Sequence, residues 1–279
     1  METEQRWRVT MKTCINGATT MPYSFEQDVR CAGAAGFDAV EIWAAKLNKY
    51  LETHSIGAAK ALLEANHLKA AALCPWSFSF FGDVEGTATA IKQGAKIAQQ
   101  LGSNLLLVCP DRPPQGMSAA EGFKTAGTVG RRYAEITGDY GVSLAIEPLG
   151  NHPFVPGAKE ALAIVAEGNH PNLGMMMDLF HYYKSGVSME EIEAIPIEKL
   201  LIIHVDDCED LPRPQLNDGH RLHPGLGVMP VKEMLGIVKR KGYDGYLSVE
   251  LFRKAYWEQS PEQISTDAKK HLDAVIAAL

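Results

Sequence analysis

The chain has 279 residues, of which 46% are hydrophobic and 22% charged, a composition that supports a sizeable apolar core. The net charge is −7, with 27 Lys and Arg against 34 Asp and Glu. This acidic balance disfavours a nucleic-acid-binding surface, which normally carries an excess of basic residues.

The expected location is the cytoplasm. The N-terminal segment METEQRWRVT is no apolar signal sequence, and no run approaches the roughly 18 apolar residues that a membrane span requires. The five cysteines are scattered and never form a C-x-x-C pair, which fits a reducing compartment. They are Cys14, Cys31, Cys74, Cys109 and Cys208.

Strand-like and helix-like segments alternate along the whole chain. Short apolar segments predict strands at 12–16, 39–43, 68–74, 105–109, 142–147, 173–178, 199–204 and 245–250. Segments with a helical period predict helices at 24–36, 54–66, 85–101, 118–141, 158–168, 180–194, 230–241 and 261–278. Ser24 with Gln27 three residues later is typical of a helix start. Residues 110–116 and 210–217 are expected to be loops at the carboxyl ends of the strands.

Eight such β-then-α units predict an α/β protein, a closed (β/α)₈ TIM barrel forming a single domain over residues 1–279. A doubly wound open sheet is the alternative. However, no G-x-G-x-x-G follows the first strand, and the phosphate-binding pattern G-x-x-x-x-G-K-[ST] does not occur. Nucleotide cofactors therefore have no support in the sequence.

Four consecutive predicted strands end in a residue that can bind a metal. These residues are Glu147, Asp178, His204 and Glu250. Carboxylate oxygen and imidazole nitrogen suit Mg, Mn, Co, Fe or Zn. In a TIM barrel the active site lies at the carboxyl ends of the strands, and neighbouring strands are only about 4.8 Å apart. We therefore predict that the four side chains converge on one divalent cation.

Other residues near these strand ends are candidates for contacts with a substrate. His181 follows Asp178 in a D-x-x-H pattern, and Arg221 lies in the loop after the seventh strand, where it could hold substrate oxygens. Trp76, together with Trp43 and Phe78, could form an apolar wall against a sugar ring. Asp206 and Asp207 are expected to accept the proton of the metal-bound His204 imidazole in a hydrogen bond.

Several sequence phrases resemble the xylose isomerase-like TIM-barrel superfamily, which includes sugar isomerases, epimerases and endonuclease IV. The phrases are DLFH at 178–181, HVDDCED at 204–210, R-x-x-PG-x-G at 221–227 and VELFR at 249–253. Together with NGATT at 16–20, they look most similar to the inosose (2-keto-myo-inositol) isomerases of inositol catabolism. The likeness spans nearly the whole chain.

The resemblance implies that the metal ligands are the four residues already selected, that Glu147 and Glu250 act as an acid/base pair, and that His181 and Arg221 contact substrate. Other branches fit less well. Endonuclease IV needs additional His residues on the early strands, where this chain has Cys74 and Cys109. It also needs Asp and His where the loop here has Gly219 and Arg221. Ketose 3-epimerases carry a further Glu after the strand-five ligand, whereas residues 151–154 supply none.

The expected function is therefore a metal-dependent isomerase or epimerase that moves a proton between carbons of a keto-polyol, with one ion of Mn, Co, Mg or Zn as cofactor. A dehydratase acting on a 3-dehydroshikimate-like or keto-sugar substrate is the alternative, and a barrel that only binds polyols is a third hypothesis. The expected partner is the small-molecule substrate, without nucleic acid or membrane. The sequence leaves the exact substrate, the metal and the oligomeric state open, and a homo-oligomer is compatible with it.

Overall fold

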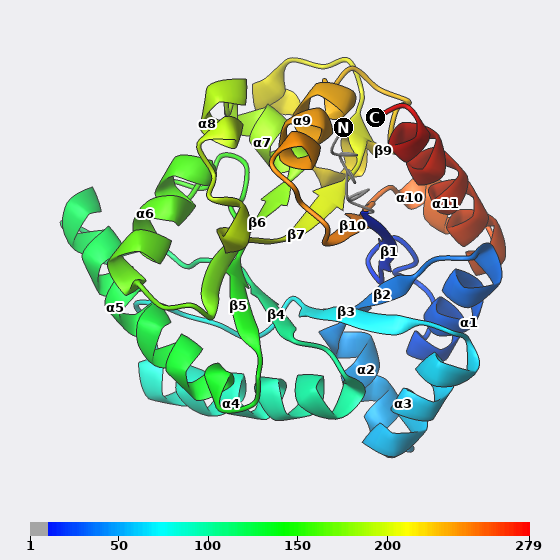
Figure 1. The fold of residues 1–279 in the computed structure, drawn as a ribbon, viewed down its shortest axis with the longest axis horizontal. Helices are drawn as coiled ribbons and strands as arrows, with labels where there is room; N and C mark the ends of the chain where they lie inside the picture. The colour runs from blue at the N-terminus through cyan, green and yellow to red at the C-terminus, as the bar shows by residue number, and fades with distance from the viewer. Residues whose placement is uncertain (1–10) are drawn as a thin grey trace, which may run out of the picture.

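The structure, a computed structural model, describes residues 11–279 and contains a closed barrel of parallel strands ringed by helices (Figure 1). The strands follow one another around the barrel in the order β1-β10-β7-β6-β5-β4-β3-β2. Their bounds are β1 Lys12–Asn16, β2 Ala39–Trp43, β3 Lys69–Cys74, β4 Leu105–Val108, β5 Ser143–Ile146, β6 Leu173–Asp178, β7 Leu200–Val205 and β10 Tyr246–Val249. The predicted (β/α)₈ fold is confirmed.

The helices pack around the outside of the barrel (Figure 1). Their bounds are α1 Phe25–Ala35, α2 Ala44–Leu51, α3 Ile56–Ala65, α4 Val84–Leu101, α5 Ala119–Gly138, α6 Ala158–Gly168, α7 Leu179–Ser185, α8 Met189–Glu193, α9 Val231–Arg240, α10 Lys254–Trp257 and α11 Pro261–Ala277. Short 3₁₀ turns occur at Ile197–Lys199, Arg213–Gln215 and Asp218–His220. Among the described residues, none of these helices combines the length and the apolar character that a membrane crossing requires.

Local signals account for most of the helix ends. Ser24 forms the expected capping box with Gln27 at the start of α1, and a second capping box at Ser118 starts α5. Gly36 and Gly102 end α1 and α4 in the left-handed conformation, with φ of 82° and 79°. Gly186, also left-handed, separates α7 from α8, so the helical region predicted around 180–194 consists of two short helices.

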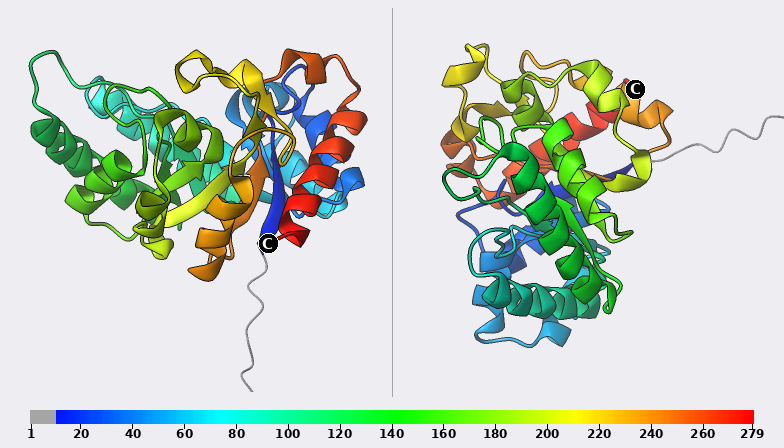
Figure 2. Two further views of the ribbon diagram at one scale, coloured as in Figure 1. Left: turned by 90° about the horizontal axis from the view of Figure 1, so that it is seen from above. Right: turned by 90° about the vertical axis from the view of Figure 1, so that its left-hand side faces the viewer.

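Three regions differ from the prediction: helix α2, the loop after β7, and the short helix α10, which has no predicted counterpart. Helix α2 begins directly after Trp43 with no side-chain cap, so the sequence signal for a helix start is missing there. The long loop after β7 contains a two-stranded antiparallel hairpin, β8 Asp207–Cys208 with β9 Arg221–Leu222. This hairpin folds the loop back over the barrel, at the end away from the C-terminus (Figure 2, left).

The alternation of side chains along the strands separates two apolar layers. In β6, Met175 and Met177 belong to the outer core between the strands and the helices, whereas Met176 belongs to a smaller cluster inside the barrel. Because successive strand residues point to opposite faces, Asp178 shares the interior face with Met176. By the same alternation, Glu147 and His204 point into the barrel, because each lies two positions after an interior residue, Ala145 and Ile202 respectively.

Candidate metal centre

The structure brings the four predicted donors together at the carboxyl end of the barrel. One donor atom from each of Glu147, Asp178, His204 and Glu250 lies within 4.8 Å of each of the others, and all four residues are buried. Asp178 and His204 are direct partners in the register of β6 and β7, and Ser248, two residues before Glu250, is the partner of His204 in β10. Strand register therefore sets the level of the group.

His204 Nδ1 lies among the three carboxylates. It is 3.1 Å from Glu250 Oε2, 3.4 Å from Asp178 Oδ2 and 3.8 Å from Glu147 Oε1. This buried nitrogen has no hydrogen-bond partner among the residues that the structure describes. Two donors that are each about 2.1 Å from one ion lie roughly 3.0 to 4.2 Å apart, depending on the angle between them. The donor types and their spacing therefore fit one divalent cation.

The electrostatics of the group favour an added positive charge. Burial, together with the nearby Glu250 and Asp178 carboxylates, raises the pKa of Glu147 to about 8, against the opposing influence of His204 and Arg221. Burial also raises the pKa of Asp178, but Arg221, His181 and His204 together outweigh it, and the net pKa lies below the ordinary range. A bound cation would offset both the burial and the repulsion that raise the pKa of Glu147.

Arg221 is completely buried beside the donor group. Its Nη1 donates to Asp178 Oδ2 at 2.7 Å and to Asp206, and lies 3.4 Å from Glu250 Oε2. Its Nη2 faces His181 Nε2 at 3.2 Å. The hairpin β8–β9 delivers Arg221 to this position, and the arginine contacts two of the proposed ligands as well as lining the cavity.

His181 is positioned by the start of α7. Asp178 caps this helix by accepting from the His181 backbone N–H at 2.8 Å. Burial lowers the pKa of the His181 imidazole, which favours the neutral ring. Because arginine can only donate, Nε2 must be the acceptor and the proton must lie on Nδ1. That Nδ1–H is buried and has no partner among the described residues.

A cavity of about 290 Å³ opens above the donor group. Glu147, Glu250, His181 and Arg221 line its polar side, with Lys184 and Asp218. Its apolar side includes Trp43, Pro75, Leu149 and Phe252. Trp43 and Phe252 meet edge to face, with ring centroids 6.0 Å apart.

Trp76, a predicted substrate contact, packs against helix α4 in the structure. Its indole N–H donates to the carbonyl of Ala90 in α4 at 2.8 Å, and its ring packs on Gly94, where an added Cβ would lie 2.5 Å from Cε2. Trp76 is not part of the cavity lining. Phe78 likewise packs against other aromatic rings, Phe80 and Tyr133, so of the three expected aromatics only Trp43 borders the cavity.

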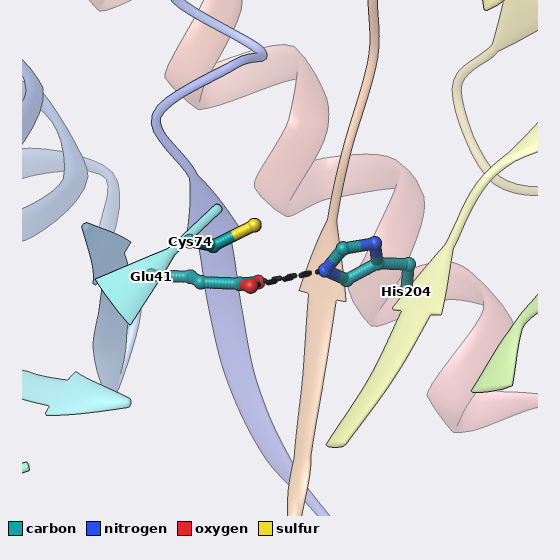
Figure 3. Close-up of side chains that lie close together, drawn as sticks. All are labelled: Glu41, Cys74 and His204. Carbon is teal, nitrogen blue, oxygen red and sulfur yellow. Dashed lines mark hydrogen bonds and ion pairs between the residues drawn. The ribbon is translucent and has the colours of Figure 1, made fainter. Parts of the chain in front are cut away.

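The second imidazole nitrogen of His204, Nε2, does not bond to Asp206 or Asp207 as predicted. Asp206 pairs with Arg221, and Asp207 accepts from the backbone N–H groups of Cys208 and Met229. His204 Nε2 instead faces Glu41, whose two carboxylate oxygens lie at 2.9 and 3.1 Å (Figure 3). We did not predict Glu41. The available signal was a charged residue two positions after Ala39 in an otherwise apolar strand, on the face that points into the barrel.

Most of the chain matches a known protein family. The family model described as a xylose isomerase-like TIM barrel matches residues 29–275. The chain belongs to the xylose isomerase-like TIM-barrel family. The resemblance seen in the sequence phrases is thereby confirmed.

Two members are similar over nearly their whole length. The inosose isomerase of Halalkalibacterium halodurans is 34% identical over 266 residues, which cover 93% of this chain and 94% of that protein. The solved structure of the IOLI protein with a bound zinc atom superposes with a TM-score of 0.88 at 30% identity, covering 96% of this chain and 99% of that one. A 3-dehydroshikimate dehydratase of Pseudomonas putida is more distant, at 25% identity over 178 residues, 63% of this chain and 28% of that protein.

Proposed function

We propose that this member of the xylose isomerase-like TIM-barrel family is a divalent-metal-dependent isomerase that moves a proton between adjacent carbons of a keto-polyol of the inosose type. The observation that carries the proposal is His204 Nδ1, which has no hydrogen-bond partner in the described part of the chain and lies among three buried carboxylates below a cavity of about 290 Å³. The relatives named inosose isomerase and the zinc-bound neighbour support the substrate class and the metal.

The residues that would hold the ion are Glu147, Asp178, His204 and Glu250. When bound, the ion supplies Lewis-acid stabilisation of the negative charge that develops on the substrate oxygens, an effect of several kcal/mol. Zinc is the metal of the solved relative, and Mn, Co and Mg suit the same oxygen-rich donor set.

The chain's own residues would transfer the protons and hold the substrate. Glu147 and Glu250 come from β5 and β10, which are separated by two strands of the barrel, and both line the cavity. One carboxylate takes the proton from the hydroxyl-bearing carbon beside the ketone, and the other group, protonated, gives a proton to the former carbonyl carbon. The hydroxyl proton passes to the former carbonyl oxygen, and proton exchange with solvent resets the two carboxyl groups, so the reaction is redox-neutral overall. The His181 Nδ1–H has no partner among the described residues and is available to donate to a substrate oxygen. Trp43 and Phe252 line the wall of the cavity that would contact the apolar face of the substrate ring.

A dehydratase is the second candidate, because it would use the same initial proton removal but expel a β-hydroxyl instead of reprotonating carbon. Only the more distant relative, matched over 63% of this chain, favours it. Incubation of metal-loaded protein with inosose in D₂O separates the two reactions by proton NMR. Solvent deuterium in the product together with a new ketone supports the isomerase, whereas an absorbing enone formed with loss of water identifies a dehydratase. Absence of both exchange and turnover would contradict an enzyme of either kind.

A threonine outside the donor group controls the backbone around Glu250. Thr19 Oγ1 donates to the carbonyl of Val249 at 2.8 Å and accepts from the N–H of Leu251 at 3.1 Å, so one buried hydroxyl bridges the residues on either side of Glu250. Lys46 holds the loop that contains Thr19, because its Nζ donates to the carbonyl oxygens of Gly17 and Thr20 at 2.8 and 2.7 Å.

We expect Thr19→Val to lower kcat by about 10- to 100-fold with little change in KM, because a carboxylate displaced by a fraction of an ångström transfers a proton poorly. Steady-state kinetics with inosose measure the split. Thr19→Ser is the matched control, since it keeps the bridging hydroxyl. Equal kcat for the Val and Ser variants would show that the bridge does not position Glu250.

The cellular location is also part of the proposal. The five cysteines are all unpaired, and four of them are buried, which supports a reducing compartment such as the cytoplasm.

A further inference from the structure

We infer that Glu41 is a positioning residue for the metal centre, which fixes the tautomer and ring orientation of His204 so that Nδ1 is the nitrogen presented to the ion. The inference rests on the proposed metal-dependent function. It extends that function to a residue in β2, which strands β1 and β10 separate from β7 and which lies 163 residues from His204 in sequence.

The geometry of the pair is specific. Both side chains are completely inaccessible to solvent, and His204 Nε2 is 2.9 and 3.1 Å from the two oxygens of Glu41 (Figure 3). An ionised carboxylate can only accept hydrogen bonds, so the proton between the two groups belongs to Nε2. In the neutral imidazole, the form that can bind a metal, the lone pair is then on Nδ1, which has no hydrogen-bond partner among the described residues and faces the other three donors.

The cost of this arrangement argues for a function. A buried carboxylate is strongly destabilising unless it is paired and hydrogen-bonded. Among the described residues, His204 is the one basic side chain that makes an ion pair with Glu41. The barrel interior around Glu41 otherwise holds uncharged side chains, the apolar Ala39 and Ala72 and the polar Asn16 and Ser248. A neutral apolar residue would fill such a position without the cost of desolvating a charge. Metal-bound histidines commonly donate their second N–H to a carboxylate, which orients the ring and increases its basicity as a ligand.

A second ion is the competing explanation of the same cluster. Glu41, Cys74 and His204 each offer a donor atom within 4.8 Å of the others (Figure 3). An ion there would have to replace the hydrogen bond between Glu41 and Nε2 and share the imidazole with the first ion. The structure favours the hydrogen bond, because the Glu41 oxygens already satisfy Nε2 at ordinary hydrogen-bond distances.

The test measures metal binding directly. The variants are Glu41→Gln, which removes the charge with little change in shape, and Glu41→Asp, which keeps the charge but shortens its reach. Zn²⁺ affinity is measured by competition with a chromogenic chelator, and stoichiometry by ICP-MS. The absorption spectrum of the Co²⁺-loaded protein reports the ligand field at the ion, which a merely structural change elsewhere would not alter. Asp38→Asn is the matched control, since this carboxylate lies just before β2 but bonds to Thr13 instead.

The expected result is one ion per chain, a 10- to 100-fold weaker affinity and an altered Co²⁺ spectrum for Glu41→Gln, a smaller loss for Glu41→Asp, and wild-type behaviour for Asp38→Asn. Wild-type affinity and spectrum in Glu41→Gln would overturn the inference while leaving the proposed function standing. Two ions in the wild type, one of them lost in Cys74→Ser, would overturn it in favour of the second metal site. A wild-type protein that binds no ion would reject the proposed function as well.

Discussion

Glu250→Gln is expected to lower kcat by about 10² to 10⁴-fold, the contribution of a positioned acid/base group, while the protein still takes up metal. The amide keeps the size of the side chain and one oxygen that can face the ion, but it cannot accept or return a proton at neutral pH. The Glu250 carboxylate lies 3.1 Å from His204 Nδ1 and also borders the cavity, so it can serve both the ion and the substrate. Turnover of inosose and ICP-MS on the same preparation measure the two effects separately.

Glu258→Gln is the control for this experiment, because Glu258 is an exposed carboxylate in the same part of the chain and is not part of the cavity lining. It should behave as wild type. A kcat for Glu250→Gln within a few-fold of wild type would show that Glu250 is not the acid/base group, even if it binds metal. The corresponding Glu147→Gln variant, which we also expect to lose turnover, would then identify whether one carboxylate is enough.

The second large effect is the loss of the ion in His204→Gln. His204 is the single nitrogen donor among the four residues, and its removal should weaken metal affinity by more than about 100-fold, beyond the range seen when only an outer partner of a ligand is changed. ICP-MS of the purified variant measures occupancy. Thermal unfolding with and without metal gives an independent measure, since a ligand at 100 times its Kd stabilises the native state by about 2.7 kcal/mol.

Wild-type protein should therefore gain thermal stability when metal is added, and His204→Gln should gain none. Because the variant also leaves Glu41 without its partner, we expect the metal-free variant to unfold at a lower temperature than the metal-free wild type. His54→Gln, at an exposed position, controls for the general loss of an imidazole. Full metal occupancy in His204→Gln would contradict the assignment of His204 as a ligand.

The barrel could be predicted because its signals are local. Each strand is a short apolar segment and most helices carry their own start and stop residues, such as the capping box at Ser24 and the left-handed glycines at positions 36 and 102. Helix α2 and the hairpin β8–β9 lack such signals. Trp43 supplies no cap, and two-residue strands such as Asp207–Cys208 are too short to show a period.

The four proposed donors could be predicted for a related reason. Parallel strands of one barrel end at the same edge, so a polar residue directly after an apolar strand is placed near its counterparts on adjacent strands. The aromatic wall could not be predicted in this way. Trp76 and Trp43 both lie at strand ends, yet Trp76 turns outward to bond with Ala90, and Trp43 borders the cavity. Side-chain direction after the end of a strand depends on packing with the next helix, which the sequence pattern does not contain.

The sequence by itself determined the fold, the family likeness and which four residues are proposed as donors, because these depend on periodicity and on the order of elements along the chain. Only the tertiary structure decided that Glu41 holds the second nitrogen of His204, that Asp206 pairs with Arg221, and that Thr19 bridges the backbone around Glu250. The physical reason is distance along the chain. Glu41 and His204 are 163 residues apart, and Thr19 and Val249 are 230 apart, so these contacts exist only once the barrel has closed.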